Sequence, residues 1–353
     1  MKIKKILITA VIVLAGLALL AAASAAIGYA LALRDPGARF LLSNTGFREP
    51  MRFVKTEVYL DVKGEKVPAM LYRFPGHVSH TYFMLQHGLT PDAYKHPKID
   101  RFARSICDAT GMNVIIPMVK GSIEGGSLTN AYQRMADIYT AVARQYPGRY
   151  RAFGACIGAN ILLVALNRVP DEYYPEKIFM LGPFADGRKL FAFYNKLLHP
   201  EDIDIMVKLA ITLNMDIFTK EEKALISKAI AASKPGVTDR SEMKKILGSK
   251  LYNDIAIVKL HHNDFEAINP RSMFSKRMKC KYFILHSKTD NIIPFYEGQN
   301  LAEFMRKSGI STNFLGTEIL DHAENKTSVT GFMHELKYMI RFFDELFEGD
   351  VEI

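Results

Sequence analysis

The sequence predicts an α/β protein built on a mainly parallel central sheet with helices on both faces. Short apolar runs alternate with helical stretches from residue 53 onward, which is typical of parallel strands joined by crossover helices. One unit, RYRAFGACIGANILLVA at residues 149–165, reads as a strand, a sharp turn and a helix. Residues 184–278 carry no strand pattern, so we expect a helical cap inserted after the sixth strand.

The composition excludes several classes of protein. The chain has 353 residues, 49% of them hydrophobic, which suits one large domain with an insertion. Its net charge is +9, but basic and acidic residues are interleaved, so no nucleic-acid partner is expected. Its three cysteines, Cys107, Cys156 and Cys280, lie far apart and outside any paired Cys or His spacing. We therefore expect no disulfide framework, no metal site and no cofactor.

Residues 1–33 are expected to be an N-terminal membrane anchor or a signal sequence. Residues 6–33 are uncharged, and a helix of about 28 residues would be about 42 Å long, more than the roughly 30 Å of a bilayer core. Basic residues in front of this run favour an inside N-terminus and an extracytoplasmic domain. Small residues at 21–26 would suit signal cleavage, which would leave a secreted or periplasmic protein. The apolar run continues through Leu33, however, and this favours an uncleaved single-pass helix over cleavage or a buried soluble helix.

Residues 34–52 are expected to be a linker, and residues 53–183 the first part of the core. Residues 53–72 alternate polar and apolar side chains around a Lys63-Gly64 turn, which predicts a hairpin. Further strands are expected where short runs are almost uniformly apolar, as in strands buried on both faces. These runs lie at residues 82–86, 113–119 and 177–181, and in the second part of the core, 279–353, at 281–286 and 312–320.

Two helices are expected between these strands. Apolar side chains recur with helical spacing over residues 97–109, and Gly111 suits the end of that helix. The same spacing recurs over residues 128–144, before Pro147-Gly148 interrupts it.

The turn of the strand–turn–helix unit carries Cys156 between Gly154 and Gly158. Small residues two before and two after let strand and helix pass close together, so the residue between them projects at the carboxyl end of the sheet. The start of a helix favours the thiolate, which is the nucleophilic form of cysteine. A buried, inert cysteine is the alternative, but the flanking glycines favour a nucleophile. No Gly-x-Ser-x-Gly sequence offers a competing serine.

The cap, residues 184–278, is expected to be helical and largely apolar inside. A capping box at Thr219 and Glu222 favours a helix start there, and some apolar side chains of the cap would line an apolar pocket. His261, His262 and Asp264 are close in sequence, but they lack further ligand spacing and are expected on a solvated surface. Helices are expected near residues 203–218, 220–233 and 240–259.

A cysteine nucleophile needs a base, and the base needs an acid that orients it. Asp290 follows the seventh strand and His322 the eighth, so both would lie at the carboxyl edge of the sheet. Asp186, just past the sixth strand, is the alternative acid. His286 ends a strand and is expected to be structural, and Asp321 is adjacent to His322 and would point away from it.

In chain order, these three residues resemble the catalytic triad of the α/β-hydrolase superfamily. The resemblance covers about residues 54–347 and includes an insertion in the usual place after the sixth strand. It implies an α/β-hydrolase fold in which Cys156 is the nucleophile, Asp290 the acid and His322 the base.

The resemblance also implies an oxyanion hole. His87-Gly88 matches the family's His-Gly turn after the third strand. The backbone N–H groups of Leu89 and of Ile157, the residue after the nucleophile, would then bind the oxyanion.

Cysteine stands where serine is usual in the family, and this affects the expected chemistry. Among relatives, dienelactone hydrolases use a cysteine there, and polyhydroxyalkanoate synthases carry a Gly-x-Cys-x-Gly sequence for acyl transfer. A thiolate forms a thioester readily, but it is also the better leaving group, so attack on amides tends to revert. Activated esters, thioesters and lactones are therefore the favoured substrates.

The sequence thus predicts a membrane-anchored hydrolase that cleaves an ester, thioester or lactone with an apolar acyl part through an acyl-cysteine intermediate. Its expected partner is a small-molecule acyl substrate. Two alternatives stay open: acyl transfer to an alcohol or thiol on the same Cys-His-Asp triad, and a non-catalytic hydrolase-fold protein. The oligomeric state is not predicted.

Overall fold

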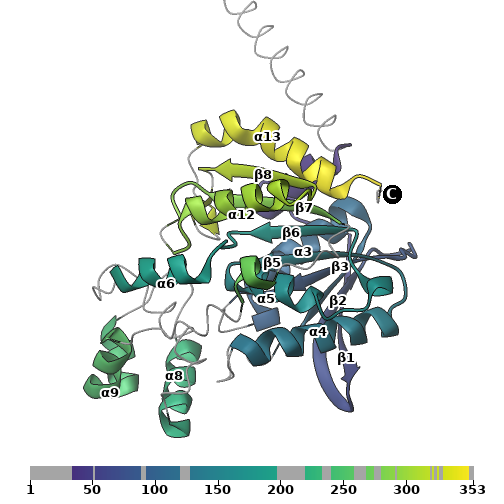
Figure 1. The fold of residues 1–353 in the computed structure, drawn as a ribbon. Helices are drawn as coiled ribbons and strands as arrows, with labels where there is room; N and C mark the ends of the chain where they lie inside the picture. Colours follow the sequence, from purple (N-terminus) through teal and green to yellow (C-terminus); the bar gives the residue numbers. More distant parts are fainter. Residues whose placement is uncertain are drawn as a thin grey trace, which may run out of the picture.

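An eight-stranded sheet forms the centre of the protein in the computed structural model (Figure 1). The structure describes residues 34–50, 52–88, 93–119, 128–196, 219–232, 240–257, 268–273, 280–290, 292–318, 320–321, 324–325 and 329–349. The strands of the sheet are β1 (Val54–Val62), β2 (Glu65–Arg73), β3 (Thr81–Gln86), β4 (Asn113–Pro117), β5 (Arg149–Ala155), β6 (Lys177–Leu181), β7 (Lys281–Ser287) and β8 (Thr312–Thr317). Their order is β1-β2-β4-β3-β5-β6-β7-β8. The sheet is mainly parallel, as predicted, because only the β1–β2 and β2–β4 pairs are antiparallel.

The hairpin predicted from residues 53–72 is confirmed. β1 and β2 pair along their whole length of 9 residues each. The turn between them holds Lys63 and Gly64 at φ values of 53° and 85°. Two-residue hairpin turns of this left-handed kind match the right-handed twist of the strands that they join.

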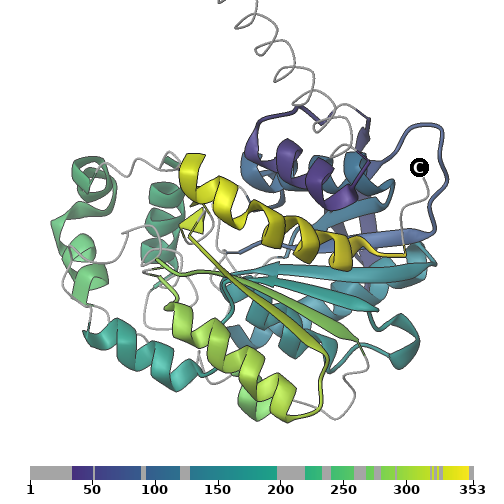
Figure 2. The same cartoon turned by 90° about the horizontal axis from the view of Figure 1, so that it is seen from above.

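Helices cover both faces of the sheet (Figure 2). One face carries α2 (Pro36–Thr45), α3 (Pro97–Thr110) and α13 (Val329–Phe347). The other carries α4 (Leu128–Gln145), α5 (Ile157–Leu166) and α12 (Phe295–Lys307). Two short 3-10 helices, Ala93–Lys95 and Asp171–Tyr173, lie in the connections.

The strands divide the apolar side chains between two cores. Successive residues of a strand point to opposite faces, and β7 illustrates the result. Tyr282 and Ile284 belong to the core under α4, α5 and α12, whereas Phe283 and Leu285 belong to the core under α2, α3 and α13. This two-sided burial is what the uniformly apolar runs of the sequence indicated.

The described residues of the insertion between β6 and β7 form helices and no strand. Its helices are α6 (Gly187–Lys196), α8 (Lys220–Ala232), α9 (Arg240–Ile257) and α11 (Pro270–Met273). α6, α8 and α9 lie beyond the carboxyl ends of the parallel strands (Figures 1 and 2). The predicted capping box is present: Glu222 N–H donates to Thr219 Oγ1 over 3.2 Å, and Thr219 N–H donates to Glu222 Oε2 over 2.9 Å. Gly248, at φ 75°, interrupts α9, and the helix expected at 203–218 lies outside the described residues.

Residues 34–52, predicted to be a linker, contain the packed helix α2 instead. Asp35 caps its N-terminus by accepting the Ala38 N–H over 3.0 Å. Phe40 is fully buried, and its ring centroid lies 4.5 Å from that of Phe343 on α13. Asp35-Pro36 at its start and Gly46 after its end are the local signals of this helix, and a helix this short is stabilised by such tertiary contacts.

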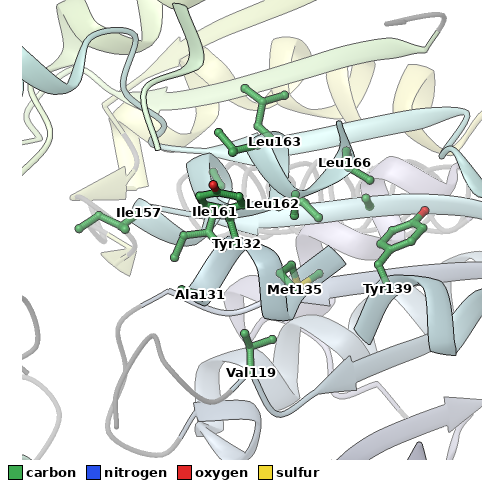
Figure 3. Packing of buried hydrophobic residues seen from close by; sticks show 14 of the residues in the cluster. Val119, Ala131, Tyr132, Met135, Tyr139, Ile157, Ile161, Leu162, Leu163 and Leu166 are labelled. Atoms are coloured by element: carbon green, nitrogen blue, oxygen red, sulfur yellow. The ribbon is translucent and has the colours of Figure 1, made fainter. Parts of the chain in front are cut away.

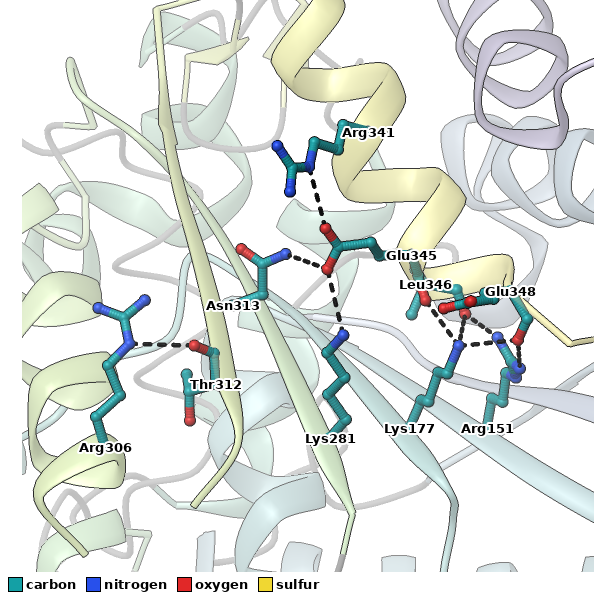
Figure 4. A network of polar contacts seen from close by, with 10 residues as sticks. All are labelled: Arg151, Lys177, Lys281, Arg306, Thr312, Asn313, Arg341, Glu345, Leu346 and Glu348. Atoms are coloured by element: carbon teal, nitrogen blue, oxygen red, sulfur yellow. Dashed lines mark hydrogen bonds and ion pairs between the residues drawn. The ribbon is translucent and has the colours of Figure 1, made fainter. Parts of the chain in front are cut away.

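Basic side chains from neighbouring strands hold the C-terminal end of α13 (Figure 4). Lys177 Nζ donates to the carbonyl oxygens of Glu345 over 2.7 Å and of Glu348 over 2.9 Å. Arg151 Nη2 donates to Glu348 O over 2.9 Å, and Lys281 Nζ lies 3.2 Å from Glu345 Oε2. The last carbonyls of a helix lack partners within the helix, and they carry the negative end of the helix dipole. These cations therefore satisfy the carbonyls of α13 and stabilise the negative end of its dipole.

Within the described ranges, no helix combines the length and the apolar character that a membrane span requires. The segment for which the sequence predicts an anchor, residues 1–33, lies outside those ranges. The anchor therefore stays a prediction.

A carboxyl pair between α2 and α13 makes stability depend on pH. Asp344 Oδ1 accepts the Gly37 N–H over 2.9 Å. Burial, together with the neighbouring Asp35, raises the pKa of Asp344 to about 7. A carboxyl whose pKa is higher in the folded chain stabilises the fold fully below its unfolded pKa of about 4, and this contribution is lost as the pH rises through 7.

We expect Asp344→Asn to raise the free energy of unfolding at pH 8 by on the order of 1 kcal/mol, allowing for solvent screening. The amide keeps an acceptor for the Gly37 N–H but carries no charge to repel Asp35. At pH 4 the variant and the natural protein should be nearly equal. Denaturant titrations at the two pH values measure this, with the exposed Glu172→Gln as the control. An equal change at both pH values would contradict the assignment.

Candidate active site

Cys156 occupies a strained turn between β5 and α5. Its φ and ψ of 56° and −136° lie where residues other than glycine are rarely found. Its backbone N–H donates to Leu181 O, at the end of β6, over 2.7 Å. The side chain is half-buried, is not part of a disulfide and makes no capping hydrogen bond to α5. Cys156 therefore stands at the carboxyl edge of the sheet and at the start of a helix.

Gly154 and Gly158 make this turn sterically possible. A Cβ atom on Gly154 would lie 2.5 Å from Ala159 Cα, and one on Gly158 would lie 2.4 Å from His87 O. Both distances are too short for a real side chain, and both neighbours are backbone atoms that cannot move aside easily. The glycines around Cys156 are thus required by close contacts of α5 with β5 and with the segment after β3.

The helix that follows Cys156 is a rigid support. All 10 residues of α5 are buried, and the helix ends at Leu166. Ile161 and Leu162 belong to the same apolar cluster as Tyr132 and Met135 of α4 (Figure 3). Because a close-packed core resists displacement of one helix, the position of Cys156 relative to the sheet is well determined.

Asp290 follows β7 and is held in one orientation. Its Oδ1 accepts the backbone N–H groups of Ile292 and Ile293, each over 2.9 Å. Its carboxyl group is buried. These two bonds hold the carboxylate in a defined direction.

The turn of Cys156 and the loop of Asp290 meet at the end of β6. Leu181 accepts the Cys156 N–H, and the next residue, Gly182, donates its own N–H to Leu285 O of β7 over 2.9 Å. A Cβ atom on Gly182 would lie 3.6 Å from Asp290 Oδ2. The predicted nucleophile and the predicted acid therefore lie on the same sheet edge, on either side of β6.

Two other titratable side chains near Asp290 have structural contacts. The ring of His286 is fully buried, and its Nε2–H donates to Ile293 O over 2.8 Å, so it supports the loop of Asp290. Asp186, the alternative acid, accepts the Arg188 N–H over 3.0 Å, and its Oδ2 lies 3.8 Å from Arg271 Nη1. Asp186 thus belongs to the base of the cap.

The predicted base, His322, and one predicted oxyanion residue, Leu89, lie outside the described residues. β8 ends at Thr317, before the predicted end at residue 320, and a short hairpin follows. In it, β9 (Leu320–Asp321) pairs antiparallel with β10 (Glu324–Asn325). β9 lies beside β7, so described residues next to His322 in sequence lie near the strand that leads to Asp290.

Gly88, which precedes the predicted oxyanion residue Leu89, lies against Cys156. A Cβ atom on Gly88 would lie 3.6 Å from Cys156 Cβ. His87 holds this segment, because its Nδ1–H donates to Gly88 O over 2.8 Å. Ile157 is the first residue of α5, where backbone N–H groups have no acceptor within the helix.

The other two cysteines differ from Cys156 in their surroundings. Cys107 and Cys280 are buried, and burial raises the pKa of each thiol to about 12. Their thiolates are therefore scarce at neutral pH, and reagents reach them slowly. Cys156 is the more accessible thiol.

Two buried polar residues near the site were not predicted from the sequence. Asn160 of α5 donates from Nδ2 to Phe184 O over 2.9 Å, and its Oδ1 accepts the Phe184 N–H over 3.1 Å. Glu297 of α12 accepts the N–H groups of Ala185 and Asp186 on Oε2, each over 3.0 Å. Burial raises the pKa of Glu297. For Asn160, the sequence did carry a signal, because it is a lone amide side chain within an otherwise apolar helix. Glu297 had no comparable signal.

Across the described ranges, no three His, Cys, Asp or Glu side chains gather closely enough to hold a metal ion. His261, His262 and Asp264, which are close in sequence, lie outside those ranges.

Comparisons with known proteins establish the fold. No family model matches the chain, and no curated protein sequence matches it. The structure of the Pyrobaculum calidifontis esterase aligns with a TM-score of 0.52 and 12% identity, over 88% of this chain and 90% of that one. Carboxyl esterase 2 of the mycorrhizal fungus Tuber melanosporum aligns with a TM-score of 0.51 and 13% identity, over 86% and 89% of the two chains.

The acylaminoacyl peptidase of Pyrococcus horikoshii is a longer protein. It aligns with a TM-score of 0.49 and 12% identity over 87% of this chain, which spans only 43% of the peptidase. Likeness at such identities concerns the fold alone. The α/β-hydrolase fold that the sequence predicts is therefore confirmed, and any activity must be argued from this chain's own residues.

His87 is expected to make the fold sensitive to acid. It is fully buried, and this burial lowers its pKa to about 4. A histidine whose pKa is lower in the folded chain stabilises the fold above its unfolded pKa of about 6.5, and the stabilisation is lost as the pH falls through 4. The free energy of unfolding should therefore drop by roughly 3 kcal/mol between pH 6.5 and 4 through this residue.

His87→Asn should abolish this part of the pH dependence, because an amide N–H can still donate to Gly88 O but does not titrate. Denaturant titrations between pH 4 and 7 measure the effect, and the exposed His80→Asn serves as the control. An unchanged pH profile in His87→Asn would show that another group is responsible.

Proposed function

We propose that the protein is a hydrolase of ester-type bonds in which Cys156 forms a covalent acyl intermediate. The observation that carries this proposal is the strained turn, with a non-glycine residue at φ 56° between two backbone contacts that exclude any side chain. Strain of this kind persists only where the surrounding structure over-determines it, and it is concentrated at functional sites.

The position of Cys156 favours its reaction as a nucleophile. It precedes the first residue of α5, so its sulfur lies near the positive end of the helix dipole, which stabilises a thiolate. In the proposed triad, His322 takes the thiol proton and Asp290 orients the imidazole ring. The two N–H bonds to Asp290 support this role, because they hold the carboxylate in a defined direction.

The proposed reaction has two steps. The thiolate of Cys156 attacks the acyl carbonyl carbon, the N–H groups of Ile157 and Leu89 stabilise the oxyanion, and the bond to the leaving alcohol or thiol breaks. The leaving group takes the proton from His322, and the acyl group remains on sulfur as a thioester. Water then gives a proton to His322 and attacks the thioester, which releases the acid and restores the thiolate.

The proposed substrates are esters, thioesters or lactones with an apolar acyl part. Leu190 of α6, Ile226 of α8 and Leu251 of α9 belong to the same apolar cluster as Ile157 at the start of α5. An apolar cap that continues from the nucleophile suits a hydrocarbon chain. The fold neighbours described as esterases agree with this class, and a cysteine nucleophile disfavours amides.

Replacement of the proposed nucleophile is the direct test. Cys156→Ala should lower kcat for a p-nitrophenyl ester by about 1000-fold, whereas Cys107→Ala and Cys280→Ala should retain most of the activity. In the natural protein at pH 7.5, iodoacetamide should modify Cys156 first, and activity should fall in parallel. Peptide mass spectrometry during the reaction measures the three thiols separately.

The outcomes of this test separate the alternatives. Full turnover by Cys156→Ala would exclude the covalent mechanism. Slow, equal alkylation of all three thiols without any hydrolysis would favour a non-catalytic protein. A competing alcohol or thiol that captures most of the acyl group would identify an acyltransferase on the same residues.

We further propose that residues 6–33 anchor the protein in a membrane as a single-pass helix, with the domain on the extracytoplasmic side. α2 begins at Pro36 and is packed on the domain, so the domain would follow the bilayer almost directly. The full chain should stay with membranes after a carbonate wash, and deletion of residues 1–33 should release it. Mass spectrometry of the mature N-terminus distinguishes an anchor from a cleaved leader, in which case the protein would be secreted or periplasmic.

A further inference from the structure

Two segments connect the cap to the sheet, and both lie against helices of the candidate active site. The outgoing segment, residues 182–186, follows β6, and the returning segment, residues 268–273, includes α11 and leads toward β7. We refer to these two segments as the cap stem. The returning segment lies beside α5, the helix that begins after Cys156.

The outgoing segment leaves the sheet between the proposed nucleophile and the proposed acid. Leu181 O accepts the Cys156 N–H over 2.7 Å, and Gly182 N–H donates to Leu285 O over 2.9 Å. Gly182 also lies next to Asp290, because a Cβ atom built on Gly182 would lie 3.6 Å from Asp290 Oδ2. A displacement of this segment would therefore move a wall of the site.

Asn160 binds the outgoing segment to the nucleophile's helix. It is fully buried on α5, about one helical turn after Cys156. Its amide makes reciprocal hydrogen bonds with the N–H and the carbonyl of Phe184, of 3.1 Å and 2.9 Å. These bonds replace the strand pairing that the chain gives up when it leaves the sheet.

Glu297 binds the next two residues of the segment to α12. Its carboxyl group is fully buried, and Oε2 accepts the N–H groups of Ala185 and Asp186. Oε1 has no hydrogen-bond partner among the described residues. A buried carboxylate with an unpartnered oxygen is costly, and the two charge-assisted bonds to the stem are what offset that cost.

The returning segment is held at the same place. Arg271 Nη1 lies 3.8 Å from Asp186 Oδ2, and its guanidinium lies 5.7 Å from the ring centre of Phe304 on α12. Asn269 is buried, and its Oδ1 accepts the Arg271 N–H over 3.2 Å. Both halves of the cap stem thus converge on α12.

We propose that Glu297 is a positioning residue that holds the cap stem as a fixed wall beside Cys156, and that this wall limits the length of the acyl chain that the site accepts. Glu297 acts through the backbone of Ala185 and Asp186. α6 begins at Gly187, directly after these contacts, and its Leu190 lies in the apolar cluster with Ile157. The part of this inference that concerns acyl chains rests on the proposed function, whereas the position of the wall does not.

Thiol alkylation and ester kinetics test the proposal in the full-length protein. Glu297→Leu removes the acceptor of the two N–H groups, and Glu297→Gln keeps a neutral acceptor of similar size. Glu303→Gln is the matched control, because Glu303 lies exposed on the same helix and pairs with Lys307 over 2.7 Å. One readout is the rate of Cys156 alkylation by a bulky maleimide relative to iodoacetamide. The other is kcat/KM for p-nitrophenyl esters from acetate to decanoate.

We expect Glu297→Leu to raise the bulky-to-small alkylation ratio about tenfold, because the wall is no longer held in place. Its preferred ester should become longer, and kcat/KM for the ester preferred by the natural protein should fall about 10- to 100-fold. Glu297→Gln should lie between Glu297→Leu and the natural protein, and Glu303→Gln should match the natural protein.

A folded Glu297→Leu variant with an unchanged alkylation ratio and an unchanged ester profile would overturn the proposal, even if its Tm were lower, because Glu297 would then only stabilise the fold. If Glu297→Leu does not fold, Glu297→Gln decides by the same two readouts. A changed alkylation ratio in a protein that hydrolyses no ester would uphold the positioning role and refute the proposed function instead.

Discussion

The close approach of α5 to β5 and to the segment after β3 is the constraint on which the candidate site depends. At Gly154 and Gly158 the backbones come so near that no side chain fits, and the chain can turn between them only if Cys156 adopts a left-handed φ. The hydrogen bond from Cys156 to Leu181 adds the neighbouring strand to the same contact. Because α5 is buried along its whole length, none of these parts can relax alone, and the strain stays at the sulfur-bearing residue.

The same two helices, α5 and α12, contact both the cap stem and the candidate active site. α5 begins after Cys156 and carries Asn160, while α12 begins a few residues after Asp290 and carries Glu297. Each helix therefore has one end at the proposed chemistry and a buried polar side chain on the cap stem. The hydrogen bonds that hold the cap stem thus lie next to the backbone between Cys156 and Asp290.

The two edges of the sheet perform different tasks. At the amino edge, Arg151, Lys177 and Lys281 are used to hold the end of α13, and α13 in turn holds α2 (Figure 4). These cations are engaged in fixing a helix and are remote from the carboxyl edge. Cys156, Asp290 and the cap lie at the carboxyl edge, where strands end and loops begin.

Local patterns in the sequence were sufficient for the strands, most helices, the hairpin turn and the position of Cys156 in its turn. Periodicity and glycine placement act over a few residues, so they can be interpreted without the fold. The tertiary structure alone decided that the helix Pro36–Thr45 packs against α13, since Gly37 bonds to Asp344 across 307 positions. It also decided the contacts of Glu297 with Ala185, 112 positions away, because such pairs depend on which segments the topology brings together and leave no trace in either segment alone.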